Sequence, residues 1–385
     1  MKVLIVHNNY GKYSGEEAVV DKMADMLTSH GHEVAFYRRT TEGVRESAVG
    51  KIKGFLSGIY SPSGVRGIWD ALRRERPDIV NVHNLYPFIS PAALFECKKS
   101  GVPVVMTIHN FRLICPTGLF MRDGLPCEVC LERGNEWSCV RYNCECNRLK
   151  SIGYTLRNVY ARWTGAYRKN VAAFACITDF QRQKLIAAGY EAERVTVIPN
   201  GIDAPTSYDL TGGNYVAYIG RLSYEKGYDL LIEVARRNPS IPFRFAGAKR
   251  EQSDMEIPGN VEFMGYLQKE ELSDFICHSR FVVMPSRCYE GFPMAILEAA
   301  CYGKPTIGPA HGGFTEIIGR GEQAIGDLFE PNNFDDLEQK VVSLWNRPDE
   351  IARLGEKAFE KLKREYSSEV IYQKWDNLFQ KLIKE

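Results

Sequence analysis

Two glutamates eight positions apart form the motif whose spacing most clearly suggests chemistry. Glu290 precedes a predicted helix that starts near Pro293, and Glu298 lies roughly 12 Å further along the axis if the spacing is helical. One ligand atom cannot contact both carboxylates, but the hydroxyls at the two ends of a nucleotide sugar could. Gly291 would let the backbone approach the middle of such a ligand. The alternative interpretation is an amphipathic helix with two solvated glutamates.

A second motif places two cations around a turn. A predicted strand at 215–219 ends at a glycine, Arg221 and Lys226 follow five positions apart, and a helix is expected after Gly227. The planar guanidinium, the compact ammonium and the free backbone N–H groups of a helix start all suit phosphate oxygens. Exposed cations often only solubilise a surface. Together with the glutamate pair, however, these two indicate a site for a nucleotide diphosphate.

With these motifs the chain resembles the retaining glycosyltransferases of family 4, which have the GT-B fold, over nearly its whole length. The resemblance rests on Arg221, Lys226, the Glu290–Glu298 pair and four more segments, namely Ser14–Glu17, Thr107–Asn110, Ile198–Asp203 and His311–Gly313 with Glu316. Similar proteins usually have two glycines before the glutamate of the opening loop. Ser14 replaces the first of them here.

The resemblance implies a reaction and a set of site residues. The reaction is retaining transfer of a sugar from a UDP- or GDP-sugar to a glycan or lipid-linked glycan, in the synthesis of a capsule or lipopolysaccharide. The expected catalytic residues are His109, Arg221, Lys226 and Glu290. The expected donor-binding residues are Gly15, Glu16, Arg221, Lys226, Glu290, Gly291, Phe292, Glu298, Gly312 and Gly313. Fixed cations would stabilise the leaving diphosphate, whereas His109 could instead simply cap a loop together with Asn110.

The chain contains no Asp-x-Asp, the usual carboxylate clamp for a divalent ion on a nucleotide-sugar donor. We therefore expect metal-independent transfer, without a catalytic metal as cofactor.

The strands and helices that must position these residues follow the same order in two parts of the chain. A strand at 3–6, a helix at 17–29 and a strand at 33–37 predict a β-α-β unit, and residues 215–247 repeat the pattern. Further apolar runs, typical of parallel strands buried on both faces, lie at 79–82, 102–108, 174–178, 195–198 and 281–284. Ligands of such sheets bind at the carboxyl ends of the strands. The opening loop, His109, Arg221 and Glu290 all fall there.

We therefore predict an α/β fold of the GT-B type, with two Rossmann-like doubly wound domains that face each other across a cleft. The acceptor-side domain would span residues 1–203, with a cysteine-rich insertion at 115–147, and the nucleotide-sugar-binding domain residues 204–366. A C-terminal helix at 367–385 would cross back to the first domain, as in similar proteins.

Cysteines concentrate in that insertion, which holds six of the eleven. Cys127 and Cys130 have the two-residue gap of a zinc knuckle, and a long loop without a core needs a cross-link. In a cytosolic protein a structural zinc is favoured over disulfides, with an iron–sulfur cluster as a third alternative. The first ligand set that we consider is Cys127, Cys130, Cys139 and Cys144.

Residues 148–169 contain six basic side chains and no acidic one, interleaved with aromatic residues. A basic, aromatic helix could attract anionic headgroups and bring the protein to a lipid-linked acceptor. The alternative is a helix that packs its aromatic side on the sheet and solvates its charges.

Composition narrows the function classes. A chain of 385 residues with 44% hydrophobic residues suits two globular domains, and a net charge of +1 argues against a nucleic-acid binder. The apolar run at 3–6 is too short for a signal peptide, and no segment reaches transmembrane length. We expect a cytoplasmic protein, at the inner face of the membrane if 148–169 binds there. Two alternatives are a nucleotide-sugar epimerase or phosphorylase of the same fold, and a non-catalytic binding protein that uses the cysteine-rich module.

Overall fold

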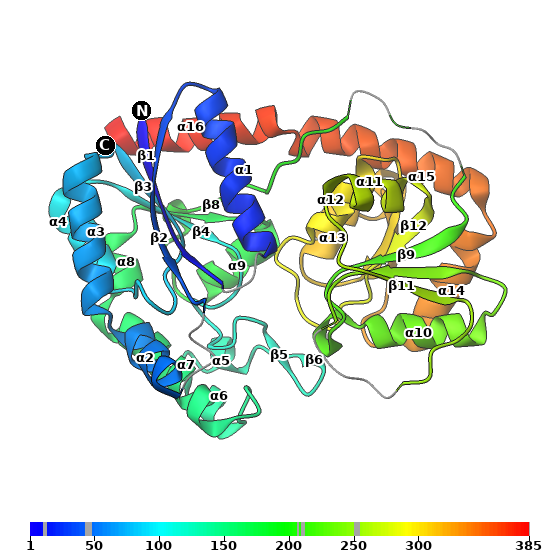
Figure 1. Cartoon of the computed structure of the whole chain (residues 1–385), viewed down its shortest axis with the longest axis horizontal. Helices are drawn as coiled ribbons and strands as arrows, with labels where there is room; N and C mark the ends of the chain where they lie inside the picture. The colour runs from blue at the N-terminus through cyan, green and yellow to red at the C-terminus, as the bar shows by residue number, and fades with distance from the viewer. Residues whose placement is uncertain (11–13, 43–47, 206–207, 209–211, 250–254, 385) are drawn as a thin grey trace. The chain divides into compact units, whose positions relative to one another are not determined.

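The computed structural model describes residues 1–10, 14–42, 48–205, 208, 212–249 and 255–384. This part of the chain divides into two compact units, each built on a six-stranded sheet (Figure 1). The first unit comprises residues 1–120, 128–199 and 372–385, and the second comprises 121–127 and 200–371. The predicted α/β class with two doubly wound sheets is confirmed.

The sheet of the first unit is parallel throughout, in the order β2-β1-β3-β4-β7-β8. Its strands are β1 (Lys2–Asn9), β2 (Glu33–Thr40), β3 (Ile79–Asn84), β4 (Val104–Ile108), β7 (Ala173–Cys176) and β8 (Val195–Val197). Val3 to Val6 of β1 and all six residues of β3 are buried, because helices cover both faces of the sheet.

The helices of the first unit connect these strands. They are α1 (Gly15–Ser29), α2 (Ala48–Ile59), α3 (Pro62–Glu75), α4 (Ala93–Ser100), α5 (Val129–Glu132), α6 (Trp137–Arg141), α7 (Arg148–Thr164), α8 (Ala166–Asn170), α9 (Asp179–Ala187) and the 3₁₀ turn η2 (Ala192–Arg194). Helix α1 begins where the Ser14 hydroxyl accepts a hydrogen bond from the Glu17 N–H at 3.4 Å. The cap places Glu16 in the first turn of the helix.

The second sheet repeats the arrangement, in the order β11-β10-β9-β12-β13-β14. Its strands are β9 (Tyr215–Ile219), β10 (Phe243–Ala246), β11 (Val261–Gly265), β12 (Ser279–Val283), β13 (Thr306–Pro309) and β14 (Gly326–Phe329). Its helices are η3 (Tyr224–Lys226), α10 (Tyr228–Arg237), α11 (Lys269–Cys277), α12 (Met294–Ala300), α13 (Gly313–Ile318), η4 (Gly321–Gln323), α14 (Phe334–Trp345), α15 (Pro348–Lys361) and the π-helical turn η5 (Leu362–Tyr366). Figure 1 shows α10 and α14 on one face of this sheet and α11 and α12 on the other.

A short hairpin, β5 (Met121–Arg122) and β6 (Leu125–Pro126), belongs to the second unit, although we placed all of 115–147 in the first. The hairpin lies close to Tyr224 of that unit, since a Cβ atom at Gly124 would lie 2.5 Å from the Tyr224 hydroxyl. The rest of the cysteine-rich segment that follows, with α5 and α6, stays with the first unit.

Helix α16 (Ser368–Lys384) provides the last segment of the first unit, from Tyr372 onward. Trp375 and Phe379 are buried there, and the Tyr372 ring stacks on His30 with centroids 3.5 Å apart. None of the described helices has the length and apolar character needed to cross a membrane.

Candidate active site

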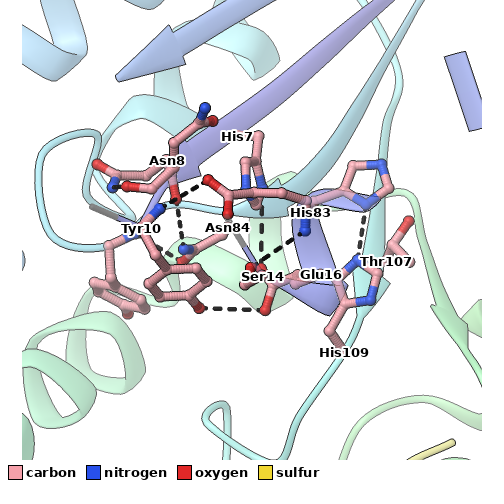
Figure 2. A network of polar contacts seen from close by, with 12 residues as sticks. His7, Asn8, Tyr10, Ser14, Glu16, His83, Asn84, Thr107 and His109 are labelled. Atoms are coloured by element: carbon pink, nitrogen blue, oxygen red, sulfur yellow. Dashed lines mark hydrogen bonds and ion pairs between the residues drawn. The ribbon is translucent and has the colours of Figure 1, made fainter. Parts of the chain in front are cut away.

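Polar side chains gather at the carboxyl ends of three neighbouring strands in the first unit (Figure 2). His7 and Asn8 directly precede the last residue of β1, His83 and Asn84 end β3, and His109 follows β4. We call these residues, with Tyr10, Glu16 and Arg112, the first cluster. It lies at the edge of the sheet where parallel α/β proteins bind ligands.

Glu16 is the carboxylate of the first cluster. The Tyr10 hydroxyl donates to Glu16 Oε2 at 3.2 Å, and His7 Nδ1 lies 3.9 Å from Glu16 Oε1. Burial raises the pKa of Glu16 to about 7, although Arg112 and Tyr10 oppose the rise. Burial also lowers the pKa of His7 to about 4, so that ring is neutral at physiological pH. Glu16 is therefore the group of this cluster that titrates near neutrality.

Arg112 was missed by the sequence analysis. Its Nη1 donates to Asn84 Oδ1 at 3.4 Å, and the charge of Glu16 and the phenol of Tyr10 raise its pKa against the opposing effect of burial. A single arginine three residues after His109 carries no spacing signal that distinguishes it from a surface cation.

His83 and His109 form the closest contact between titratable groups in the first cluster. His83 Nδ1 lies 2.8 Å from His109 Nε2, and the rings stack with centroids 5.1 Å apart. Burial is the main cause that lowers the pKa of both, for His109 to about 3. Both rings are therefore neutral.

Asn8 and Asn84 hold the backbone that surrounds the first cluster. Asn8 Oδ1 accepts from the Phe88 N–H at 3.0 Å, while Asn84 donates to the Asn8 carbonyl at 2.9 Å and accepts from the Tyr86 N–H at 3.0 Å. Both side chains therefore have a structural role, since they hold neighbouring backbone segments in place.

The second unit brings the predicted cations to the ends of its central strands, and we call this group the second cluster. Arg221 follows β9 and its Nη2 lies 3.2 Å from Glu225 Oε1. Lys226 closes η3 and pairs with Glu290 Oε1 through its Nζ. Ser286, in the loop after β12, donates to the same carboxylate oxygen at 2.9 Å.

The ion pair of Lys226 and Glu290 is partly buried, and each partner holds the other in its charged form. Burial opposes ionisation of Glu290, but Lys226 and Ser286 outweigh it and lower its pKa. Burial likewise opposes the charge of Lys226, but Glu290 raises its pKa. The site thus presents a permanent cation and a permanent carboxylate.

A glycine allows the two loops of the second cluster to touch. Gly227 has a φ of +69°, and a Cβ atom there would lie 1.9 Å from the carbonyl oxygen of Pro285. Arg287 joins the same two loops. Its guanidinium binds both carboxylate oxygens of Asp229 at 2.6 Å and donates to the Tyr224 carbonyl at 2.7 Å. This fork was not predicted, because nothing in the sequence distinguishes Arg287 from the other arginines.

The remaining predicted donor residues surround this group. The Gly313 N–H donates to the Glu290 carbonyl at 2.8 Å, and a Cβ atom at Gly313 would lie 2.5 Å from the Gly291 carbonyl oxygen. Glu298 is partly exposed on α12, while Phe292 is buried with its ring 5.7 Å from that of Tyr366. Gly15 and Glu16 lie in the first unit instead, at the start of α1.

The predicted zinc ligands are not supported. Within the described ranges, no three His, Cys, Asp or Glu side chains are grouped so as to hold a metal ion. Cys127 belongs to the second unit and Cys130, Cys139 and Cys144 to the first. Cys139 is buried in α6, and hydrogen bonding to Cys144 is the main cause that lowers its pKa. The insertion is stabilised instead by packing and by hydrogen bonds such as that from Arg162 Nε to Glu136 Oε1 at 3.0 Å.

Comparison with known families gives two matches that together span most of the chain. The family described as Glycosyltransferase Family 4 matches residues 13–205, and the family described as Glycosyl transferases group 1 matches residues 207–361. The two matched segments correspond closely to the two sheets.

Two curated relatives illustrate the range of similarity. An uncharacterized 42.6 kDa protein in the cps region of Klebsiella pneumoniae is 26% identical over 388 residues, covering 89% of this chain and 96% of its own length. The poly(ribitol-phosphate) alpha-N-acetylglucosaminyltransferase of Staphylococcus aureus strain COL is 27% identical over 248 residues, covering 56% of this chain and 47% of the enzyme.

Solved structures show the same fold. HepE of Anabaena, in complex with UDP and glucose, superposes with a TM-score of 0.69 at 17% identity and covers 99% of this chain and 100% of its own. The apo form of the lipopolysaccharide outer core galactosyltransferase WaaB gives a TM-score of 0.63 at 16% identity, with 99% and 100% covered. At such identities the likeness shows the fold alone, and it confirms the predicted GT-B fold.

Proposed function

Because the chain belongs to glycosyltransferase family 4, we propose that it transfers a sugar from a nucleoside diphosphate to a glycan or lipid-linked glycan acceptor. The observation that carries this proposal is the second cluster. A partly buried lysine and a partly buried carboxylate are held together at the strand ends, with Arg221 and the backbone of Gly313 nearby. Cations stabilise a diphosphate, and a carboxylate accepts bonds from sugar hydroxyls.

In the proposed reaction, Arg221 and Lys226 bind the diphosphate and stabilise the charge that grows on it as the sugar departs. Glu290 and Glu298 accept hydrogen bonds from the hydroxyls of the hexose and the ribose, with Gly291, Phe292, Gly312 and Gly313 lining the donor site. The donor is a UDP-sugar in the first instance, since HepE was solved with UDP and with UDP-glucose, and a GDP-sugar is the alternative.

Lys226 must exchange partners when the donor binds. In the free protein its ammonium pairs with Glu290. A diphosphate brings more charge than one carboxylate, so Lys226 would turn to the phosphates and release Glu290 for the sugar. We propose that this exchange supplies the cation without a divalent metal, and that the new bond keeps the anomeric configuration of the donor.

On the first unit, we propose that His109 donates to a hydroxyl of the transferred sugar and that Gly15 and Glu16 contact the ligand near the diphosphate. The relative from a cps region supports a capsule or another surface polysaccharide as the product. Helix α7 would bring the protein to the inner face of the membrane, since Trp163 is 83% exposed and Leu149 74% exposed among its basic residues.

The first test is thermal unfolding of the whole chain with the diphosphates of uridine, guanosine, adenosine and thymidine and with their sugars. A ligand at a hundred times its Kd stabilises the folded state by about 2.7 kcal/mol. The nucleotides with the matching base should therefore clearly raise the midpoint temperature of unfolding. Lys226→Ala and Glu298→Ala should abolish the rise, whereas Lys340→Ala, which alters a half-exposed lysine of α14, should keep it. If no nucleotide stabilises the wild type, the donor site is refuted.

A second measurement separates the proposal from its competitors. Release of nucleoside diphosphate only when an acceptor is present would exclude an epimerase or a phosphorylase, and activity in EDTA would support a metal-independent reaction. NMR of the product gives the anomeric configuration. Salt-sensitive RNA binding without any sugar transfer would favour the binding-protein alternative instead.

A further inference from the structure

We propose that His83 is a positioning residue, which holds His109 as a neutral ring with its proton on Nδ1, so that His109 acts as a hydrogen-bond donor and never as a base. The catalytic part of this inference rests on the proposed function, while the protonation of the free protein does not. His83 received no role from the sequence analysis.

The backbone makes the contact between the two histidines possible. Strands β3 and β4 are parallel neighbours, with Val82 opposite Met106. His83 is the next residue of β3, and His109 directly follows β4. Both side chains therefore start at the same edge of the sheet, and Figure 2 shows their rings facing each other with one nitrogen of each joined.

A bond between two neutral imidazoles needs one protonated nitrogen, and two arrangements are conceivable. Either His83 Nδ1–H donates to His109 Nε2, or His109 Nε2–H donates to His83 Nδ1. The distance of 2.8 Å is the same for both. The choice depends on the second nitrogen of His83.

That second nitrogen, His83 Nε2, is buried and has no hydrogen-bond partner among the residues that the structure describes. If His83 accepted from His109, its own proton would sit on Nε2 as a buried N–H group without an acceptor. If His83 donates, Nε2 is a bare lone pair. Orphaned buried N–H groups are rarer in proteins than under-satisfied acceptors. The His83 ring therefore carries its proton on Nδ1 and donates.

The tautomer of His109 follows from this choice. Its Nε2 lone pair accepts the proton of His83, so a neutral His109 must carry its own proton on Nδ1. Burial disfavours a second proton on either ring. No basic lone pair is left on His109 to take a proton from an acceptor hydroxyl, and only Nδ1–H can serve a ligand.

Substitutions of His83 test its hydrogen bond to His109, because they can remove the hydrogen-bond donor of the side chain while they keep its volume. In His83→Asn, the side-chain amide nitrogen can take the place of Nδ1 and keep a donor toward His109. In His83→Leu, the volume remains but the donor is lost. The control is His278→Asn, which removes an exposed histidine at the end of α11.

The direct readout is ¹⁵N NMR of histidine-labelled, ligand-free protein, with the His109 signals assigned from the loss of signals in His109→Gln. We expect Nδ1 of His109 to be protonated and Nε2 not, in the wild type and in His83→Asn. His83→Leu should show exchange between both tautomers. A proton on His109 Nε2 in the wild type would overturn the inference, whatever the enzyme binds.

The kinetic readout uses release of UDP from UDP-glucose. His83→Leu should lower kcat by about tenfold with little change in KM, because a hydrogen bond between two neutral groups contributes a factor of this size. His83→Asn should recover most of that loss. Equal losses in both variants, with the fold intact by thermal unfolding, would contradict the positioning role. A protein that gives the expected NMR result but binds no nucleotide would refute the proposed function alone.

Discussion

At the scale of single residues, the chemistry of this chain is set by which charges burial allows. Burial neutralises His83 and His109 and keeps Glu16 partly protonated, whereas Lys226 and Glu290 remain ionised because they are paired. The residue types were all visible in the sequence. Their protonation was not, because it depends on distances and solvent exposure that no spacing encodes.

Glu16 gives the first prediction, a carboxyl that titrates near pH 7. ¹³C NMR of the glutamate carboxyl groups, followed from about pH 4 to about pH 9, should show one signal that changes near neutrality and is absent from Glu16→Gln. Asp25→Asn, at an exposed position of the same helix, should leave that signal in place. A Glu16 signal that titrates near pH 4.5 would show that Arg112 dominates burial.

The same group affects stability in a defined direction. Its pKa is raised in the folded state, so between about 4.5 and 7 the folded chain keeps a proton that the unfolded chain has lost. The free energy of unfolding should therefore fall as pH rises through this window, by up to about 3 kcal/mol from this group. Glu16→Gln should flatten the slope in urea unfolding monitored on the first unit.

At the scale of elements, the positions of the loops at the strand ends could be predicted, but the side-chain contacts that join one loop to another could not. Arg221, Lys226 and Glu290 were expected together from their motifs, and the structure brings all three to the second cluster. The start of α12 near Pro293 was predicted as well. The fork of Arg287 on Asp229 was invisible, because it joins residues 58 positions apart that carry no shared pattern.

The Arg287 fork gives the prediction at this scale. Arg287 is 9% exposed and fixes the loop after β12 to the start of α10. Arg287→Lys keeps the charge but loses the bidentate geometry, so it should lower the free energy of unfolding of the second unit by about 2 kcal/mol and weaken UDP binding. Urea unfolding and calorimetric titration with UDP measure the two effects.

Arg353→Lys is the matched control, since Arg353 also binds a carboxylate, Glu350 at 2.6 Å, but on an exposed helix face. An exposed pair is worth roughly 0–1 kcal/mol, so this change should be nearly silent. Equal effects of the two substitutions would show that the Arg287 fork does not hold the loops.

At the scale of the whole molecule, the sequence predicted two doubly wound domains because the β-α-β pattern and the apolar strands occur twice. The exact partition was harder to predict. Residues 121–127 group with the second unit, where Gly124 lies close to Tyr224, and the main division falls between Pro199 and Asn200. Short polar segments carry little hydrophobic pattern. The domain to which such a segment belongs is therefore decided by a few contacts that form only in the folded chain.

The return of the chain to the first unit through α16 gives the last prediction. Phe379 is fully buried and its ring lies 5.4 Å from that of Trp375, also buried, in a unit that otherwise consists of residues before 200. Phe379→Ala removes a large core side chain and leaves a cavity, which should cost about 3–5 kcal/mol. The loss should be local to the first unit, because the second unit has its own core around β9, β10 and β12.

Hydrogen exchange measured peptide by peptide distinguishes a local from a global effect. In Phe379→Ala, exchange should rise in β1, β3 and β4 and stay unchanged in β9, β12 and β13. Lys374→Ala, an exposed position on the same helix, should change neither set. A uniform rise across both sheets would mean that the two units unfold as one cooperative body. No rise in the first sheet would mean that the end of α16 contributes nothing to its stability.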